Sequence, residues 1–183
     1  IVNSKAGTVP DPTYVAPKAV CSTNTVKTNF AGILSVALNN VKYSSGSSAT
    51  DNGNIDKSAN TNNYFQINTG NTNTINVGMY TVNEQQLGIW IDWNDDGDFN
   101  DEAEQQYLAQ NIAANSTIQH PITYPTNIPY GDYLRIRLIT DINSDYQGGS
   151  LITSACHTTL NSGQSEDYAL YIERRTSAWT GTT

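Results

Sequence analysis

Alternation of apolar and polar residues in short runs is the feature that most restricts the fold of this chain. In a strand, neighbouring side chains point to opposite faces, so a run with a period of two buries one face and exposes the other. Asn, Gly, Ser and Asp cluster between the runs, as turns require, most clearly at 44–54. The apolar positions of the six runs are Leu34, Val36 and Leu38; Phe65 and Ile67; Ile75, Val77 and Met79; Leu87, Ile89 and Ile91; Leu134, Ile136 and Leu138; and Tyr168, Leu170 and Ile172.

The pattern predicts an all-β domain, an antiparallel β-sandwich of jelly-roll or immunoglobulin-like type with about eight strands. The stretch 101–113 combines good helix formers with ambiguous apolar spacing, so it is predicted as either a short helix or a strand. Residues 1–19 contain three prolines in an unpatterned stretch and are predicted to be a linker. The domain is expected over 20–174, and 175–183 is expected to be a linker to a following domain.

Composition excludes several classes of function. The formal net charge is −8 and only nine Lys and Arg residues are present, so no basic face is available for nucleic acid or an anionic membrane surface. No apolar run approaches the roughly 20 residues that span a bilayer. Cys21 and Cys156 are either two buried thiols or one disulfide; a disulfide fits a secreted polar chain and would stabilise it by roughly 4–5 kcal/mol.

An acidic stretch, "IDWNDDGDFNDEAE" at 91–104, follows one of the predicted strands. Oxygen-bearing side chains at alternate positions, followed by a glycine at the sixth, resemble the front half of an EF-hand calcium loop. The twelfth position is Ala103, so the closing carboxylate is displaced from the EF-hand arrangement. The predicted Ca²⁺ ligands in this loop are Asp92, Asn94, Asp96, Asp98, Asp101 and Glu104.

The charge of the stretch favours a bound cation over an empty, solvated turn. No Lys or Arg occurs between Lys57 and Arg135. Two carboxylates about 4 Å apart repel by roughly 1 kcal/mol in water and about 4 kcal/mol at an effective dielectric of 20. Ca²⁺ accepts six to eight oxygens in flexible geometry, whereas Mg²⁺ requires strict octahedral geometry and Zn²⁺ prefers nitrogen or sulfur. Asp167, before the last strand, is either a solvent-facing charge or a remote ligand of the same ion.

Catalysis is not expected. His120 alternates with Ile118 and Ile122, which is typical of a packed strand residue. His157 follows Cys156 directly, and adjacent strand side chains point to opposite faces, so the two make a poor catalytic pair. Aromatic residues offer faces for stacking on a sugar. Those at exposed or turn positions are Trp90, Trp93, Tyr124, Tyr130, Tyr133 and Tyr146.

Four elements of the sequence resemble the GEVED domain, a family of secreted and surface proteins of Bacteroidetes and their relatives. They are Cys21, the loop "IWIDWNDDGDFNDEAE", the strand "IPYGDYLRIRL" and the final "ACHTTLNSGQSEDYALYI". Together they span about residues 20–173. The chain departs from the naming motif at Gln164 and Ser165, which replace Glu and Val, so any role of that first Glu is lost.

The resemblance implies a β-sandwich attached to adhesins, peptidases or polysaccharide-degrading enzymes, with Cys21 and Cys156 paired. We therefore expect a non-catalytic, calcium-stabilised extracellular module of a secreted or cell-surface protein, serving adhesion, spacing or substrate attachment. Its partners are then the neighbouring domains of the same polypeptide. The alternative is a carbohydrate-binding module attached to a secreted hydrolase, with a glycan or other cell-surface ligand as partner.

Overall fold

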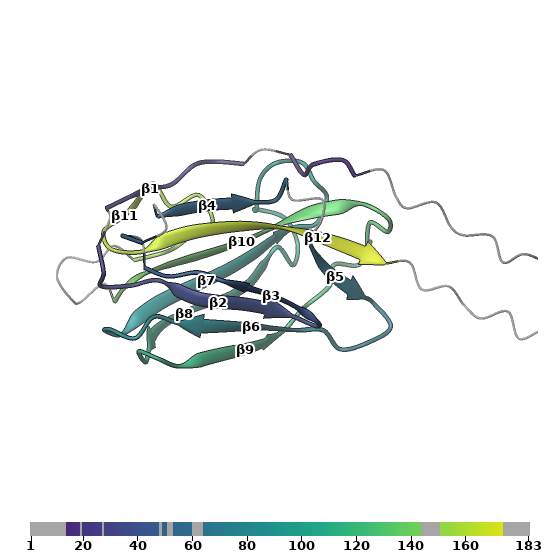
Figure 1. Cartoon of the computed structure of the whole chain (residues 1–183). Helices are drawn as coiled ribbons and strands as arrows, with labels where there is room; N and C mark the ends of the chain where they lie inside the picture. The colour runs from purple at the N-terminus through teal and green to yellow at the C-terminus, as the bar shows by residue number, and fades with distance from the viewer. Residues whose placement is uncertain are drawn as a thin grey trace, which may run out of the picture.

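The computed structural model describes residues 14–18, 20–26, 28–47, 49–50, 53–59, 64–143 and 151–173. These residues form twelve strands and no helix, arranged as two packed sheets and one short pair of strands (Figure 1). The all-β sandwich predicted from the alternation is therefore confirmed. The strands are β1 Asn24–Thr25, β2 Ile33–Leu38, β3 Val41–Ser44, β4 Asn54–Lys57, β5 Phe65–Asn68, β6 Thr74–Met79, β7 Gln85–Asp92, β8 Gln105–Ile112, β9 Thr117–Pro121, β10 Tyr133–Ile142, β11 Thr159–Leu160 and β12 Gln164–Glu173.

The larger sheet has the order β4-β12-β10-β7-β8, and the smaller sheet has the order β3-β2-β6-β9. The larger sheet is mixed, because one of its edges contains parallel pairs. β4 and β5 both pair with β12 in parallel, β4 alongside Ser165–Tyr168 and β5 alongside Leu170–Glu173, so they lie end to end along the same strand. The two-residue strands β1 and β11 also pair in parallel.

The core between the two sheets follows the predicted alternation closely. Leu134, Ile136 and Leu138 of β10 and Leu170 of β12 are fully buried in it. One predicted position is wrong: Ile33 is buried where Leu34 was expected, because a bulge interrupts the pairing of β2 with β6 between Ile33 and Ser35. A bulge inserts one extra residue, so the side chains before it change face.

The outer face of the larger sheet is covered as well, since β7 and β10 are buried along their whole length. A second, smaller core lies on this outer face, formed by Trp90, Phe99, Ile139, Ile152, Ala155 and Leu160. Both faces of β7 and β10 are therefore packed, whereas in a simple two-layer sandwich the outer face of each sheet can remain exposed to solvent.

The ambiguous stretch 101–113 contains a turn followed by strand β8. Residues 14–18, which the sequence analysis assigns to a linker, contact the larger sheet: the Tyr14 ring lies 4.5 Å from that of Tyr133, and Arg135 Nε donates to the Lys18 carbonyl at 3.0 Å. Within the described part of the chain, we find no helix with the length and apolar character needed to span a membrane.

Candidate metal centre

The acidic loop joins β7 to β8 and is fixed to the domain by two aromatic side chains. Trp93 is 3 % exposed, and its Nε1 donates a hydrogen bond to the Ala103 carbonyl at 3.0 Å. Phe99 is 6 % exposed and packs in the outer core. The loop reverses direction at Gly97, whose φ of 96° lies in the left-handed region that glycine adopts without strain. The acidic side chains are thereby held between two buried anchors.

Asp92 and Glu104, at the two ends of the loop, are fully buried, and their carboxylates accept hydrogen bonds from the loop backbone. The Asp92 carboxylate accepts hydrogen bonds from the N–H groups of Asp96 and Gly97 at 3.2 and 3.1 Å. Glu104 accepts from the N–H groups of Trp93 and Asp101 at 3.0 and 2.9 Å. Burial raises the pKa of Asp92 and raises that of Glu104 to about 7, with the charges of Asp92 and Asp101 adding to the effect on Glu104.

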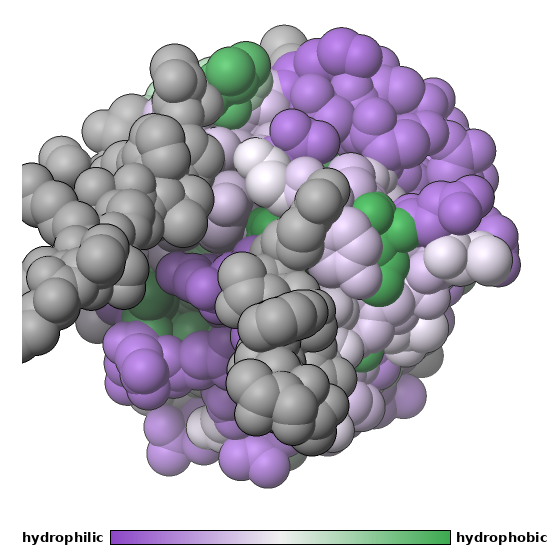
Figure 2. Space-filling model, turned by 90° about the vertical axis from the view of Figure 1, so that its right-hand side faces the viewer, coloured by the Kyte–Doolittle hydropathy of each residue, from purple (hydrophilic) through white to green (hydrophobic). Residues whose placement is uncertain are grey.

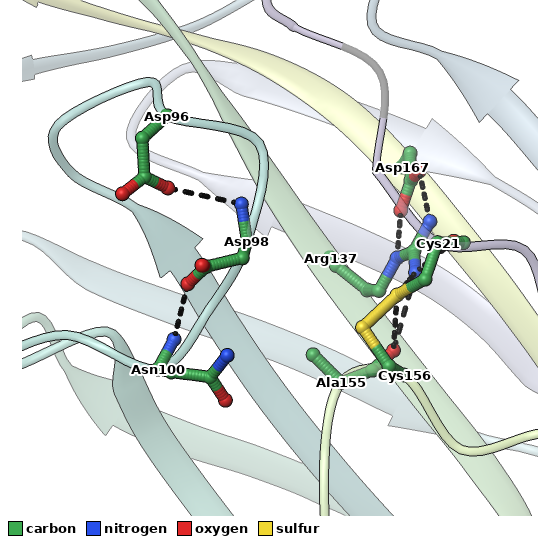
Figure 3. The surroundings of a disulfide bond; sticks show 8 residues. All are labelled: Cys21, Asp96, Asp98, Asn100, Arg137, Ala155, Cys156 and Asp167. Atoms are coloured by element: carbon green, nitrogen blue, oxygen red, sulfur yellow. Dashed lines mark hydrogen bonds and ion pairs between the residues drawn. A yellow bond between two sulfur atoms is a disulfide. The ribbon is translucent and has the colours of Figure 1, made fainter.

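Three carboxylates, those of Asp96, Asp98 and Asp101, converge on the exposed side of the loop. One oxygen atom of each lies within 4.8 Å of the others. The amide nitrogen of Asn94 donates to Asp96 Oδ2 at 2.9 Å and to Asp101 Oδ2 at 2.7 Å. The pKa of Asp96 is lowered, chiefly because its carboxylate accepts the N–H of Asp98 at 3.0 Å (Figure 3). An all-oxygen set of this kind could hold a hard metal ion.

The structure thus divides the six ligands predicted in the loop into two groups. Asp96, Asp98 and Asp101 face one another, and Asn94 lies beside them with its amide nitrogen towards the carboxylates. For Asn94 to be a ligand, its amide must turn so that the oxygen faces the ion. Asp92 and Glu104 bond the loop backbone instead, which the spacing of the acidic residues did not indicate.

Asp167, the remote ligand considered from the sequence, lies in a different place. On the outer face of β12 it accepts from Arg137 Nε and Nη2, both at 2.7 Å, and from Arg135 Nη1 at 2.8 Å. All three side chains are at most 6 % exposed. Two arginines already neutralise this carboxylate, which favours a structural ion pair over metal binding at Asp167.

The ion pairs of these two arginines were not predicted from the sequence. Alternation puts Arg135 and Arg137 on the face of β10 opposite the core but gives no partners for them. The signal that could have found them is the register, because Arg137 and Asp167 are directly opposite each other on β10 and β12. Opposite charges at facing positions of one sheet face attract, but a single sequence does not fix which residues face each other.

The disulfide between Cys21 and Cys156 is present, with Cα atoms 5.5 Å apart. Arg137 joins it to the rest of the outer layer, as Figure 3 shows: its Nη1 donates to the carbonyls of Cys21 at 2.6 Å and Ala155 at 3.1 Å. The guanidinium carbon also lies 5.5 Å from the centre of the Phe99 ring. Arg137 therefore connects the disulfide, Asp167 and the inner side of the acidic loop.

The aromatic residues considered for ligand stacking are mostly unavailable. Trp90, Trp93 and Tyr133 are 1, 3 and 7 % exposed. Trp90 lies in the outer core, Trp93 lies in the core between the sheets, and Tyr133 packs against the rings of Tyr14, Tyr64 and Tyr171. Tyr124 is half-buried, accepts a hydrogen bond from Asn73 and lies 5.6 Å from the Trp93 ring. Tyr130 is 38 % exposed. Tyr146 lies outside the described residues.

Comparison with known families agrees with this geometry. The model of the GEVED domain matches residues 86–171, a range that contains the acidic loop, both arginines and Asp167. Searches of the curated proteins and of the solved structures found no match to the chain. The GEVED family is a non-catalytic, accessory type of domain. Residues 86–171 of this chain are therefore similar to the GEVED domain.

Proposed function

We propose that this domain is a non-catalytic, calcium-stabilised module of a secreted or cell-surface protein, in which it spaces or attaches neighbouring domains. The accessory character of the GEVED family supports this proposal. So does the disulfide, since such bonds persist in extracellular compartments. The partners are the other domains of the same polypeptide.

The observation that carries the calcium assignment is the convergence of Asp96, Asp98 and Asp101 on one exposed point. Carboxylates so close repel one another, and a divalent cation removes that repulsion. The set offers no nitrogen or sulfur ligand for zinc, and a loop of exposed carboxylates suits the variable coordination of calcium better than the strict octahedron of magnesium. The ion would link the middle of the loop to its ends, where the Asp92 and Glu104 carboxylates already hydrogen-bond the loop backbone.

Calcium is expected to raise the melting temperature of the wild-type domain. An ion that binds only the folded state at one hundred times its Kd stabilises it by about 2.7 kcal/mol, or about 5–10 °C for a chain of this size. Asp96→Asn should remove most of this gain while keeping the oxygen that accepts the Asp98 N–H. Thermal melts with calcium, with magnesium and with EDTA measure the difference.

Glu102→Gln is the matched control, because Glu102 is an exposed acid of the same loop outside the carboxylate cluster. It removes one negative charge without removing a proposed ligand, so it should keep the calcium gain. A gain that fell equally in both variants would indicate general charge screening rather than a site. No gain at millimolar calcium in the wild type would refute the calcium assignment.

A second candidate function is carbohydrate binding, favoured by a polar groove of about 580 Å³. It is lined largely by neutral amides, among them Asn40, Gln66 and Asn71, with Glu173 as the one carboxylate. Planar amides can both donate to and accept from sugar hydroxyls. The Tyr130 hydroxyl lies 3.3 Å from Oγ1 of Thr69, which follows the lining residue Asn68 in the chain. Figure 2 views the molecule from the end where β5 and β12 finish, and the surface visible there is mostly hydrophilic.

If this groove binds sugars, Tyr130→Ala should abolish binding to any glycan that the wild type retains on an array. Tyr130→Phe keeps the ring and should keep most of the affinity, because stacking depends on the aromatic face. The absence of any bound glycan, in calcium and in EDTA, would dismiss the carbohydrate function and leave the spacing module.

A further inference from the structure

One acid of the loop, Asp95, is not used by the proposed calcium set. It occupies the fourth position, between Asn94 and Asp96, and its side chain is the acceptor for a distant part of the chain. Asp95 Oδ1 accepts a hydrogen bond from the backbone N–H of Lys18 at 2.8 Å. The φ of Asp95 is 52°, a left-handed conformation that Asp and Asn tolerate better than most residues.

The segment that it holds, Tyr14–Lys18, is fastened at both ends. At one end Arg135 Nε donates to the Lys18 carbonyl at 3.0 Å, so both backbone groups of Lys18 are bonded to the domain. At the other end the Tyr14 ring packs 4.5 Å from that of Tyr133, and its hydroxyl donates to the Ser58 carbonyl. Between them Pro17 is buried, whereas Val15 is 70 % exposed.

We expect the docking of this segment to be marginal, because within the described part of the chain it is held mainly at its two ends. A five-residue extended segment buries little apolar surface, and such segments open with a free energy far below that of global unfolding. A hydrogen bond to a charged acceptor contributes about 1.5–3 kcal/mol, which is a large share of what holds the segment. The Asp95–Lys18 bond therefore decides how long the segment stays docked.

We propose that the acidic loop is the docking site of residues 14–18, and that cation binding in the loop controls this docking. The inference rests on the proposed calcium site. The ion would fix Asp96, the residue next to Asp95, and so hold the Asp95 carboxylate at hydrogen-bond distance from the Lys18 N–H. Without the ion, repulsion among the Asp96, Asp98 and Asp101 carboxylates lets the loop move, and the short-range hydrogen bond is lost.

The docked segment determines where the preceding chain joins the domain. Lys18 lies three residues before Cys21, which the disulfide and Arg137 hold in place. Figure 1 shows that the described start of this segment and the end of β12 reach the same end of the sandwich. Calcium would therefore convert a loosely attached entry into a fixed one at the end of the module where both described chain ends lie.

Hydrogen exchange of the Lys18 amide, followed by NMR with and without calcium, tests the coupling. We expect calcium to increase the protection of this amide by about 10- to 150-fold, the effect of one charge-assisted hydrogen bond. Asp95→Gly removes the acceptor yet tolerates the φ of 52°, so Lys18 should exchange rapidly in both conditions. Asp95→Asn keeps Oδ1 as an acceptor and should retain most of the calcium-dependent protection.

The outcomes separate this inference from the proposed function. If calcium raises the melting temperature but leaves the exchange of Lys18 unchanged, the calcium site stands and the control of docking is refuted. If calcium changes neither, the proposed function fails and the inference fails with it. Rapid exchange at Lys18 in wild-type protein under every condition would show that Asp95 does not hold the segment.

Discussion

Arg137→Met is expected to destabilise the domain by about 3–5 kcal/mol, the cost of breaking a buried ion pair by removing one partner. The guanidinium makes two 2.7 Å hydrogen bonds to Asp167 and also donates to the carbonyls of Cys21 and Ala155. Methionine approximates the length of the side chain but supplies no donor, so both carbonyls lose their bonds from Arg137 and Asp167 keeps the bond from Arg135 Nη1. Chemical denaturation of both proteins at the same calcium concentration measures the loss.

Arg135→Met is the matched control, since Arg135 is the neighbouring buried arginine on the same face of β10. It shares Asp167 through a single nitrogen, and its other carboxylate partner, Asp56, has a side chain that is 60 % exposed. Arg137 would still hold both oxygens of Asp167, so the expected loss is only about 1–2 kcal/mol. Equal losses in the two variants would contradict the central role given to Arg137.

Removal of the disulfide is the second change with a large expected effect. Cys21 and Cys156 are 135 residues apart, and closing a loop of that length lowers the entropy of the unfolded chain by an amount worth about 5 kcal/mol. The Cys21→Ala, Cys156→Ala double variant should lose roughly this much stability in urea denaturation. Replacing both cysteines avoids a free thiol that could form other bonds.

Reduction of the wild type offers an independent measurement if the double variant does not fold. Dithiothreitol should shift the denaturation midpoint in the same direction and by a similar amount. The effect also has a local part, because the Cys21 carbonyl accepts from Arg137. Losses below about 1 kcal/mol in both experiments would show that the outer layer holds Cys21 in place without the covalent bond.

The sequence predicted the inner layer of the fold because the inner layer depends on alternation alone. Leu134, Ile136 and Leu138 face the core as expected. The sequence did not predict burial on the outer face of the larger sheet, because packing rather than alternation determines it. Trp90 alternates outward from β7, yet it is 1 % exposed in the outer core. The residues that cover it, such as Ile152 and Leu160, come from irregular or two-residue elements that carry no periodic signal.

The acidic cluster was predictable because the spacing of its oxygen-bearing side chains is local. Asp96, Asp98 and Asp101 occupy positions within six residues, and the turn at Gly97 brings them together. The roles of Asp92 and Glu104 were not predictable, because spacing does not reveal which carboxylates turn towards backbone N–H groups. The approach of Lys18 to Asp95 was not predictable either, since 77 residues separate the two.

The departure from the naming motif also has a physical consequence. Gly163 leaves no room for a side chain, since a Cβ there would lie 1.6 Å from the Thr140 carbonyl oxygen. After it, the Gln164 amide donates to the buried Glu166 carboxylate, which also accepts from Tyr168 and Ser45. A neutral amide at 164 supplies a donor to Glu166 where a second carboxylate would repel it.

A crystal structure of the domain grown in calcium, with anomalous data to identify the ion, tests the account most directly. We predict one calcium ion bound by carboxylate oxygens of Asp96, Asp98 and Asp101, at about 2.3–2.6 Å. Ordered water alone among these three side chains at millimolar calcium would contradict the assignment, and the loop would then be a solvated acidic turn on a disulfide-bonded sandwich.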